Sequence, residues 1–285
     1  MKGGFKVGIT VCAEKLSPSA PVVFTGDLEY AVRRCSELGY DGVELQLRDP
    51  DSLDWNLLFS LLDRYGLRVS AIATGLEYTL AGLSMISDDE KVRAELRRRI
   101  FADIALAQKL GCPVIVGCIR GNIPDSSDRE KLLARFREEL LLYSAEAQKL
   151  SVTLVIEAIN FYINNYLCTV RETCDFIDSL GRDNVKLHVD THHMAIEEKD
   201  MIRAVELAGK RIGYVHLAEN NRMYPGSSCI DFPGVLKALE KTGYKGWVTF
   251  EIIPEPDADT AAANSIDYIA SISSDSRGGG KANAV

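Results

Sequence analysis

Residues 152–190 contain three segments in succession, VTLVIE (152–157), VRETCDFIDSL (170–180) and VKLHVD (185–190). The first and last are short and rich in apolar and β-branched residues, as buried strands are. The middle segment has apolar side chains at the spacing of an amphipathic helix. A strand, a helix and a second strand in this order predict a βαβ unit, in which the two strands run parallel.

The same alternation continues in both directions along the chain. Strand candidates lie at 6–11, 42–47, 67–73, 113–118, 152–157, 185–190, 212–217 and 247–252. Helix candidates lie at 27–38, 52–65, 88–110, 128–149, 170–180, 200–208, 233–242 and 257–272. Eight such units in about 250 residues predict an α/β protein with a single-domain (β/α)8 TIM barrel. An open doubly wound sheet is the alternative, but the first strand runs into CAEKLSPSAP (12–21) and not into a glycine-rich phosphate-binding turn.

Glycines and a low-complexity segment mark the predicted boundaries. Five glycines each follow a helix candidate and precede a strand, where a left-handed residue ends a helix: Gly39, Gly66, Gly111, Gly181 and Gly243. We predict a barrel domain over residues 1–272 and a disordered tail over 273–285, which is rich in Ser, Gly and Ala. The longest loops follow strands, where a barrel builds its active site, at 74–87, 119–127, 158–168, 191–199 and 218–232.

Composition excludes several classes of protein. The 285 residues carry 33 basic and 41 acidic side chains, a formal charge of −8. This balance argues against nucleic-acid binding, which uses a basic face, and the run of arginines at 97–99 is interpreted as a solvated helix face. No apolar run approaches the ~20 residues of a membrane span, and MKGGFKVGIT lacks the pattern of a signal peptide. The seven cysteines include no C-x-x-C pair, so we expect reduced thiols in a cytoplasmic protein.

Four consecutive strand candidates carry potential metal ligands at or near their ends. In chain order these are Glu157, Asp190, His216 and Glu251. In a barrel such ends point toward a common centre, where three carboxylates would repel one another and a divalent cation would remove the conflict. Oxygen ligands with one imidazole suit Mn²⁺, Mg²⁺ or Co²⁺, and do not resemble a thiolate-rich zinc site. The alternative is that each residue caps a helix or pairs with an arginine.

A metal centre with two glutamates on different strands fits proton abstraction next to a carbonyl group. The cation polarises a ketone and its adjacent hydroxyl, one carboxylate removes the carbon-bound proton, and an enediolate forms beside the cation. A second carboxylate returns a proton to the opposite face of the same carbon, which inverts it. Glu157 and Glu251 lie on strands three apart in the predicted ring and could flank a substrate in this way, so we predict them as the catalytic pair.

Two further residues are candidates for substrate binding. His193 lies three residues after Asp190, and Arg222 lies six residues after His216, on the following loop. A loop histidine bonded to the backbone and a surface salt bridge are the corresponding structural alternatives. His188 and His192 are interpreted as structural.

The same segments resemble a known family. VIEAIN (155–160), HVDTHHMAIEE (188–198), HLAENNRMYPG (216–226) and FEIIP (250–254) are similar to strand-end motifs of the sugar isomerase/epimerase superfamily, which has a xylose isomerase-like TIM barrel. The resemblance is to its D-tagatose/D-psicose 3-epimerase group in particular, and it extends to about residue 268.

This resemblance implies a role for each candidate residue. Four would bind one divalent ion, Mn²⁺ in the first place and Mg²⁺ or Co²⁺ otherwise: Glu157, Asp190, His216 and Glu251. His193 and Arg222 would bind the substrate, a ketose or keto-sugar acid, and the two glutamates would transfer protons through a cis-enediolate. Relatives are commonly dimers or tetramers, so a homo-oligomer is expected.

The segment after the fifth strand departs from the family pattern. The family usually continues as E-P-x-N-R-[FY]-E, whereas here the arginine is replaced by Phe161 and the second glutamate by Ile163. This change leaves the metal ligands intact but alters the substrate pocket, which then suits a less hydroxylated or a carboxylated sugar. VELQLRDPDSLDW (43–55) and AIATGLEYTLAGLSM (71–85) look more like 5-keto-L-gluconate epimerase, which implies a keto-sugar acid.

Other functions share parts of this pattern. An aldose–ketose isomerase would use the same metal and bases but return the proton to the neighbouring carbon. A lyase of the inosose dehydratase type shares the barrel and the metal, and a non-catalytic sugar-binding protein would not need two candidate bases. Metal-dependent phosphodiester hydrolysis uses several zinc ions and many histidines, whereas this chain has four histidines.

Overall fold

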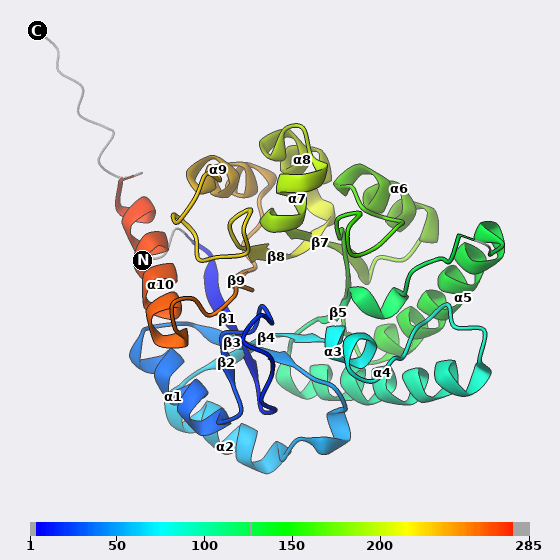
Figure 1. Cartoon of the computed structure of the whole chain (residues 1–285), viewed down its shortest axis with the longest axis horizontal. Coiled ribbons are helices and arrows are strands. Elements are labelled where there is room, and N and C mark those ends of the chain that lie inside the picture. The colour runs from blue at the N-terminus through cyan, green and yellow to red at the C-terminus, as the bar shows by residue number, and fades with distance from the viewer. Residues whose placement is uncertain (1–3, 126, 276–285) are drawn as a thin grey trace, which may run out of the picture.

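Eight parallel strands form a closed barrel in the computed structural model, which describes residues 4–125 and 127–275 (Figure 1). The barrel strands are β1 (Lys6–Cys12), β3 (Gly42–Gln46), β4 (Arg68–Ala73), β5 (Val114–Val116), β6 (Leu154–Glu157), β7 (Val185–Asp190), β8 (Ile212–Leu217) and β9 (Trp247–Phe250). They pair in chain order, and β1 pairs with β9, which closes the ring. A short strand, β2 (Phe24–Thr25), pairs with the last residues of β1. The predicted single-domain (β/α)8 TIM barrel is confirmed.

Helices surround the barrel at the predicted places (Figure 1). They are α1 (Leu28–Glu37), α2 (Trp55–Tyr65), α4 (Glu90–Leu110), α5 (Arg129–Lys149), α6 (Val170–Leu180), α8 (Met201–Ala208), α9 (Phe232–Thr242) and α10 (Ala258–Asp275). Short helical segments add to these: α3 (Gly75–Thr79), α7 (Thr191–Glu197) and the 3₁₀ turns η1 (Pro50–Ser52), η2 (Cys118–Arg120) and η3 (Gly209–Arg211).

Local sequence signals explain where the helices begin and end. Aspartate or threonine side chains accept a hydrogen bond from a backbone N–H of the first turn and so cap seven of these surrounding helices: Asp27, Asp54, Asp89, Asp128, Thr169, Asp200 and Asp231. The five glycines predicted as left-handed residues all have a positive φ, between 62° and 83°. These caps fix the lengths of the helices, and therefore where each strand starts and which side chains reach its carboxyl end.

Two of the expected loops are partly helical. The loop expected at 191–199 contains α7, because Asp190 accepts a hydrogen bond of 2.8 Å from the N–H of His192 and starts a helix immediately after β7. The loop expected at 74–87 contains α3, which packs against η2. Both segments border the carboxyl end of the barrel, so they narrow the space above the strands.

The barrel interior is polar on one side, directly beneath the strand ends. The Tyr214 hydroxyl lies 2.7 Å from both the Ser70 and the Thr249 hydroxyls and donates to Glu44 at 2.8 Å. All four residues are completely buried. An apolar interior cluster adjoins them, consisting of Ala71, Ala73, Ile115, Val155 and Tyr214. Buried polar groups that are fully hydrogen-bonded hold one arrangement, so this network is a rigid floor for the site above it.

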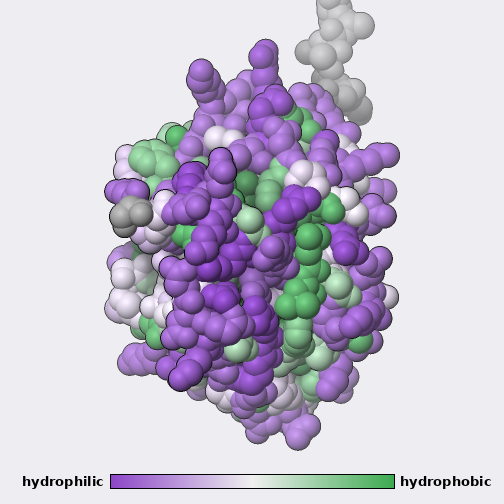
Figure 2. Space-filling view, turned by 90° about the vertical axis from the view of Figure 1, so that its right-hand side faces the viewer, coloured by the Kyte–Doolittle hydropathy of each residue, from purple (hydrophilic) through white to green (hydrophobic). Residues whose placement is uncertain are grey.

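The remaining sequence predictions concern the surface and the thiols. All seven cysteines are free thiols. The arginines at 97–99 lie on α4 and pair with carboxylates of α4, α5 and the η1 segment. Figure 2 shows one side of the molecule, which is mostly hydrophilic with a narrow hydrophobic band. None of the helices described is both long and apolar enough to cross a bilayer. Of the predicted tail, α10 includes residues 273–275, and 276–285 lie outside the described residues.

Candidate active site and metal centre

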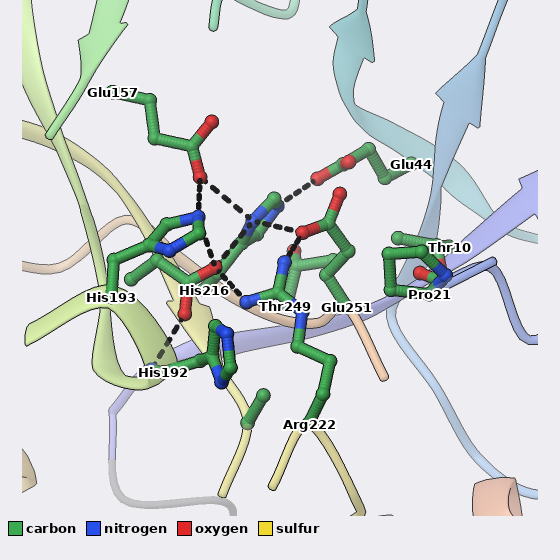
Figure 3. Close-up of polar contacts among 12 residues, drawn as sticks. Thr10, Pro21, Glu44, Glu157, His192, His193, His216, Arg222, Thr249 and Glu251 are labelled. Carbon is green, nitrogen blue, oxygen red and sulfur yellow. Dashed lines mark hydrogen bonds and ion pairs between the residues drawn. The ribbon is translucent and has the colours of Figure 1, made fainter. Parts of the chain in front are cut away.

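Four side chains converge at the carboxyl ends of β6 to β9. They are the residues expected from the strand pattern: Glu157, Asp190, His216 and Glu251. One ligand atom from each lies within 4.8 Å of the others. Figure 3 shows the His216 ring facing this cluster, with His193 and Arg222 beside it. The structure therefore brings together all six candidate site residues.

His216 is held in place from the opposite side of the barrel. Its Nε2 lies 2.7 Å from an oxygen of Glu44, which is on β3 and fully buried. Its Nδ1 has no hydrogen-bond partner among the described residues and lies 3.4 Å from Glu251, 3.6 Å from Asp190 and 4.0 Å from Glu157. Burial would lower the pKa of His216, but the Glu44 and Asp190 carboxylates outweigh it and raise the pKa to about 10.

Asp190 has two functions in the structure because its two oxygens face different groups. One accepts the hydrogen bond that starts α7, and the other lies 3.6 Å from Nδ1 of His216. The second oxygen also accepts from Arg222 at 2.5 Å. The carboxyl group is completely buried, which opposes ionisation, yet the charge of Arg222 and the nearby histidines hold its pKa well below the usual range. Asp190 is therefore an anion in this site.

Arg222 bridges two of the converging carboxylates, Asp190 and Glu251. Its backbone has a positive φ of 65°, which is uncommon for a residue with a side chain. Two backbone hydrogen bonds of 2.9 Å hold it there, one from its N–H to Glu219 and one from the N–H of Ile253 to its carbonyl. The guanidinium is thus held beside the metal candidates (Figure 3), and Arg222 lines the same pocket as three of them.

Glu157 and His193 form the other side of the site. His193 Nδ1 lies 2.7 Å from the side-chain amide nitrogen of Asn160, so Nδ1 accepts and the ring proton is on Nε2, which lies 3.5 Å from Glu157. Burial opposes the ionisation of Glu157, but the hydrogen bond from His193 and the charge of His216 outweigh this effect and lower its pKa. A side chain at Gly117 would place a Cβ 2.8 Å from Oε2 of Glu157, so glycine there leaves room for the carboxylate.

Three site residues were not predicted from the sequence. Glu44 and Gln46 face the barrel interior from β3; Gln46 donates to Glu44 at 2.8 Å and to Glu251 at 3.3 Å. Glu219 is fully buried and accepts hydrogen bonds from three backbone N–H groups of the loop that carries Arg222. Glutamates inside apolar strand or loop segments were the available signal, and two polar residues spaced by two along a strand share one face.

His188 and His192, predicted as structural, differ from each other in their surroundings. His188 is buried beneath the site, its ring packs edge-on against that of His216 at 4.2 Å, and burial lowers its pKa to about 3. His192 lies at the pocket, and its Nδ1 is 3.3 Å from the carbonyl oxygen of Glu219. His188 is therefore a neutral packing residue, whereas His192 is also part of the pocket wall.

A cavity of about 390 Å³ opens at three of the four converging ligands, Glu157, His216 and Glu251. One part of its wall is polar and contains Gln46, Glu157, His192, His193, His216, Arg222 and Glu251. The other part comes from the loop after β1, from β4, β5 and α3, and from the loop after β6; it contains Pro21, Val22, Leu76, Ile115, Ile159 and Ile163, among others. We call these the polar wall and the apolar wall.

The four side chains that converge at the strand ends fit one divalent cation. Three carboxylates and one imidazole nitrogen converge, and that nitrogen is buried without a hydrogen-bond partner among the described residues. A ligand set of this kind suits hard or borderline ions. Cys118 lines the same cavity, but burial raises the pKa of its thiol to about 11, so it offers no thiolate. The fold and the site thus define a TIM barrel with a candidate metal centre at its carboxyl end.

Comparison with known proteins identifies the family. Residues 32–272 match the family described as xylose isomerase-like TIM barrel, and the chain belongs to it. An L-ribulose 3-epimerase from Methylomonas sp. (strain DH-1) is 33% identical over 254 residues, which cover 86% of this chain and 87% of that protein. A ketose 3-epimerase from Arthrobacter globiformis is 30% identical over 239 residues, 81% of each chain. The solved structure of a D-allulose 3-epimerase from Methylomonas sp. has a TM-score of 0.80 at 26% identity, with 94% of this chain and 98% of that chain covered.

These similarities confirm the resemblance drawn from the strand-end motifs. The relatives span most of the chain and are named as epimerases. The chain is therefore an enzyme, an isomerase of the epimerase type.

Proposed function

We propose that this protein is a divalent-metal-dependent sugar epimerase that inverts a hydroxyl-bearing carbon next to the ketone of a ketose. Glu157 and Glu251 are its two proton-transfer groups, His193 and Arg222 bind the substrate, and the metal ligands are Glu157, Asp190, His216 and Glu251. The relatives named as L-ribulose, ketose and D-allulose 3-epimerases support a ketose and its third carbon.

One observation carries the proposal: the two glutamates approach the same point from strands β6 and β9, which β7 and β8 separate. The oxygens of Glu157 and Glu251 nearest to Nδ1 of His216 are Oε1 and Oε2 respectively. Each glutamate therefore keeps a second oxygen that can reach a substrate. Two bases on different sides of one carbon are what inversion requires, because the proton leaves one face and another arrives on the opposite face.

A divalent cation, when bound, would polarise the ketone and stabilise negative charge on the neighbouring oxygens. One glutamate takes the proton from the hydroxyl-bearing carbon, and the other donates a proton to the opposite face. The Nε2–H of His193 donates to a substrate oxygen, since its Nδ1 is held by Asn160. The Arg222 guanidinium pairs with the carboxylates of Asp190 and Glu251, and its remaining N–H groups bind substrate oxygens.

The proposal also covers the ion, the compartment and the assembly. We propose Mn²⁺ as the native cation, with Mg²⁺ or Co²⁺ as substitutes, because the ligand set consists of carboxylates and one imidazole. A cytoplasmic location agrees with the seven free thiols. A homodimer or homotetramer is our expectation from the family resemblance.

The test is hydrogen exchange in deuterated water with Mn²⁺ and L-ribulose or D-allulose as substrate. The wild type should incorporate one deuterium at the third carbon and form the epimer. Glu157→Gln and Glu251→Gln should each lower this exchange by about 10²- to 10⁴-fold, the usual contribution of a general acid or base. Glu255→Gln, at an exposed position close to Glu251 in the chain, is the matched control.

Metal binding by each variant is measured in parallel, so that loss of proton transfer is distinguished from loss of the ion. Near-normal exchange in either glutamate variant would contradict the two-base assignment. Appearance of an aldose in place of the epimeric ketose would make the enzyme an aldose–ketose isomerase.

A further inference from the structure

The apolar wall of the pocket carries information about the substrate that the metal centre does not. Its side chains come from four separate parts of the chain: Val22 after β1, Leu76 in α3, Ile115 in β5, and Ile159 and Ile163 after β6. The cavity thus brings together apolar side chains from segments that lie far apart in sequence. A surface of this kind binds an apolar part of a ligand and disfavours a polar one.

A sugar acid would need a cationic partner for its carboxylate, and the apolar wall offers none. Arg222 is the one arginine or lysine among the described residues that line the cavity, and it is paired with Asp190 and Glu251. Arg120 lies nearby but is completely buried; it donates to the backbone carbonyl of Glu157 at 2.5 Å and does not line the cavity. A carboxylate against the apolar wall would lose its water without a charge-assisted hydrogen bond.

The apolar wall also offers few hydrogen bonds to a terminal hydroxyl group, because the polar groups of this wall already have partners. The Thr79 hydroxyl donates to the carbonyl of Gly75 at 3.1 Å. The backbone N–H of Ile163 donates to Asn160, and its carbonyl accepts from Asn122 at 2.7 Å. The Cys118 thiol stays neutral and is a weak donor. A sugar hydroxyl placed at this wall would therefore exchange its hydrogen bonds with water for apolar contacts.

Resting on the proposed function, we infer that the preferred substrate is an uncharged ketose with a terminal deoxy carbon. Its ketone and reacting carbon lie at the polar wall. The longer arm of the sugar, on the far side of the reacting carbon, lies along the apolar wall and ends in a methyl group. Because Ile163 replaces the family's glutamate, two kinds of substrate were left open, a less hydroxylated sugar and a carboxylated one. The pocket favours the less hydroxylated sugar.

The test compares kcat/KM of the Mn²⁺-loaded enzyme for three substrates that differ at the last carbon: a ketohexose, its 6-deoxy analogue and the corresponding keto-sugar acid. The 6-deoxy ketose should exceed the ketohexose by about 10-fold and the acid by about 100-fold or more, the range over which apolar pockets discriminate polar groups. Equal or higher kcat/KM for the ketohexose or the acid would overturn the inference.

A gain-of-function variant adds a second readout. Thr79→Arg places a cation at an exposed position that lines the pocket and should raise kcat/KM for the keto-sugar acid about 10-fold or more. Leu80→Arg, at the next position and 54% exposed but outside the pocket, is the matched control and should change nothing. An acid rate that Thr79→Arg leaves unchanged would also count against the inference.

The two proposals fail in different ways. If none of the three sugars, nor L-ribulose or D-allulose, exchanges hydrogen with solvent, the proposed epimerase function is wrong and the inference is wrong with it. If exchange occurs but the acid or the ketohexose is preferred, the epimerase function stands and only the inference about the substrate is wrong.

Discussion

The polar wall and the apolar wall enclose one pocket, but the polar groups of the two walls have different kinds of bonding partner. In the polar wall, charged side chains contact one another: Arg222 bridges Asp190 and Glu251, and Glu44 holds His216. In the apolar wall, polar groups bond to nearby uncharged groups: the Thr79 hydroxyl donates to the Gly75 carbonyl, and the Ile163 carbonyl accepts from Asn122. Under the proposed function, proton transfer takes place at the polar wall and the far end of the sugar is selected at the apolar wall, so that a change in one wall need not alter the other.

The largest expected effect comes from the residue at which the two walls touch. Gly117 lies between β5 and η2, and a Cβ there would lie 2.8 Å from Oε2 of Glu157. Gly117→Ala should displace the carboxylate and lower kcat about 100-fold, because small misplacements of reacting groups cost rate steeply. Gly75→Ala is the control, since Gly75 also lines the pocket but its Cβ would meet no atom within 4 Å. Equal loss of activity in both variants would contradict a specific effect on Glu157.

A second prediction weakens the polar wall from beneath. Glu44→Gln removes the charged partner of His216 Nε2, which orients the ring. Loss of such a partner typically lowers metal affinity about 10- to 100-fold, which titration calorimetry with Mn²⁺ would measure. Glu138→Gln, at an exposed position on α5, should bind the ion as the wild type does. Unchanged affinity in Glu44→Gln would show that the ring is held by packing alone.

A third prediction makes the apolar wall polar. Ile163 lines the pocket and is 42% exposed, so a glutamate there is compatible with folding. Ile163→Glu should shift kcat/KM toward the fully hydroxylated ketose, relative to its 6-deoxy analogue, about 10-fold, the value of one hydrogen bond to a charged group. Ile196→Glu, 37% exposed on α7 and outside the pocket, should leave the ratio unchanged. The same shift in both variants would indicate a general charge effect.

The smallest expected effect concerns stability, behind the apolar wall. Glu77 in α3 and Asp103 in α4 are completely buried, and none of their oxygens has a hydrogen-bond partner among the described residues. The pKa of Glu77 is raised first by burial and then by the neighbouring carboxyl group of Asp103. The pKa of Asp103 is raised by burial. The charge of Arg99 lowers both pKa values in part, and the charge of Asp49 raises them further.

A carboxyl group whose pKa is raised on folding binds its proton more tightly in the folded state. It therefore stabilises the folded state fully below its unfolded pKa of about 4, and this stabilisation is lost as the pH rises. The melting temperature should therefore fall between pH 4.5 and 8. Glu77→Gln removes one titrating group and should recover about 1 kcal/mol or more at pH 8, the free energy of one pKa unit. A melting temperature that rises with pH, or that Glu77→Gln leaves equally steep, would contradict this.

The order of strands and helices could be predicted because its signals are local. Asp and Thr caps, glycines such as Gly66 and apolar runs that end in a charged residue all act within a few positions of the chain. The four metal candidates could be predicted for the same reason, because each one ends a strand or lies next to the end of one. The helix α7 was missed because a single capping hydrogen bond from Asp190 starts it within an expected loop.

Contacts between distant segments could not be predicted from one sequence. Glu44 meets His216 across 172 positions of the chain, and no local pattern connects them. The apolar wall was missed for a related reason: in sequence, residues such as Val22 and Leu76 look like ordinary core residues. Only the closure of the barrel shows that they face an open cavity.

The two oxygens of Asp190 have a practical consequence. An asparagine begins a helix about as well as an aspartate does, because its side-chain oxygen accepts the same backbone N–H. Asp190→Asn would therefore preserve the start of α7 while removing one negative charge from the neighbourhood of His216 and Arg222. Such a variant would isolate what the buried charge contributes to the centre, with the start of the neighbouring helix left intact.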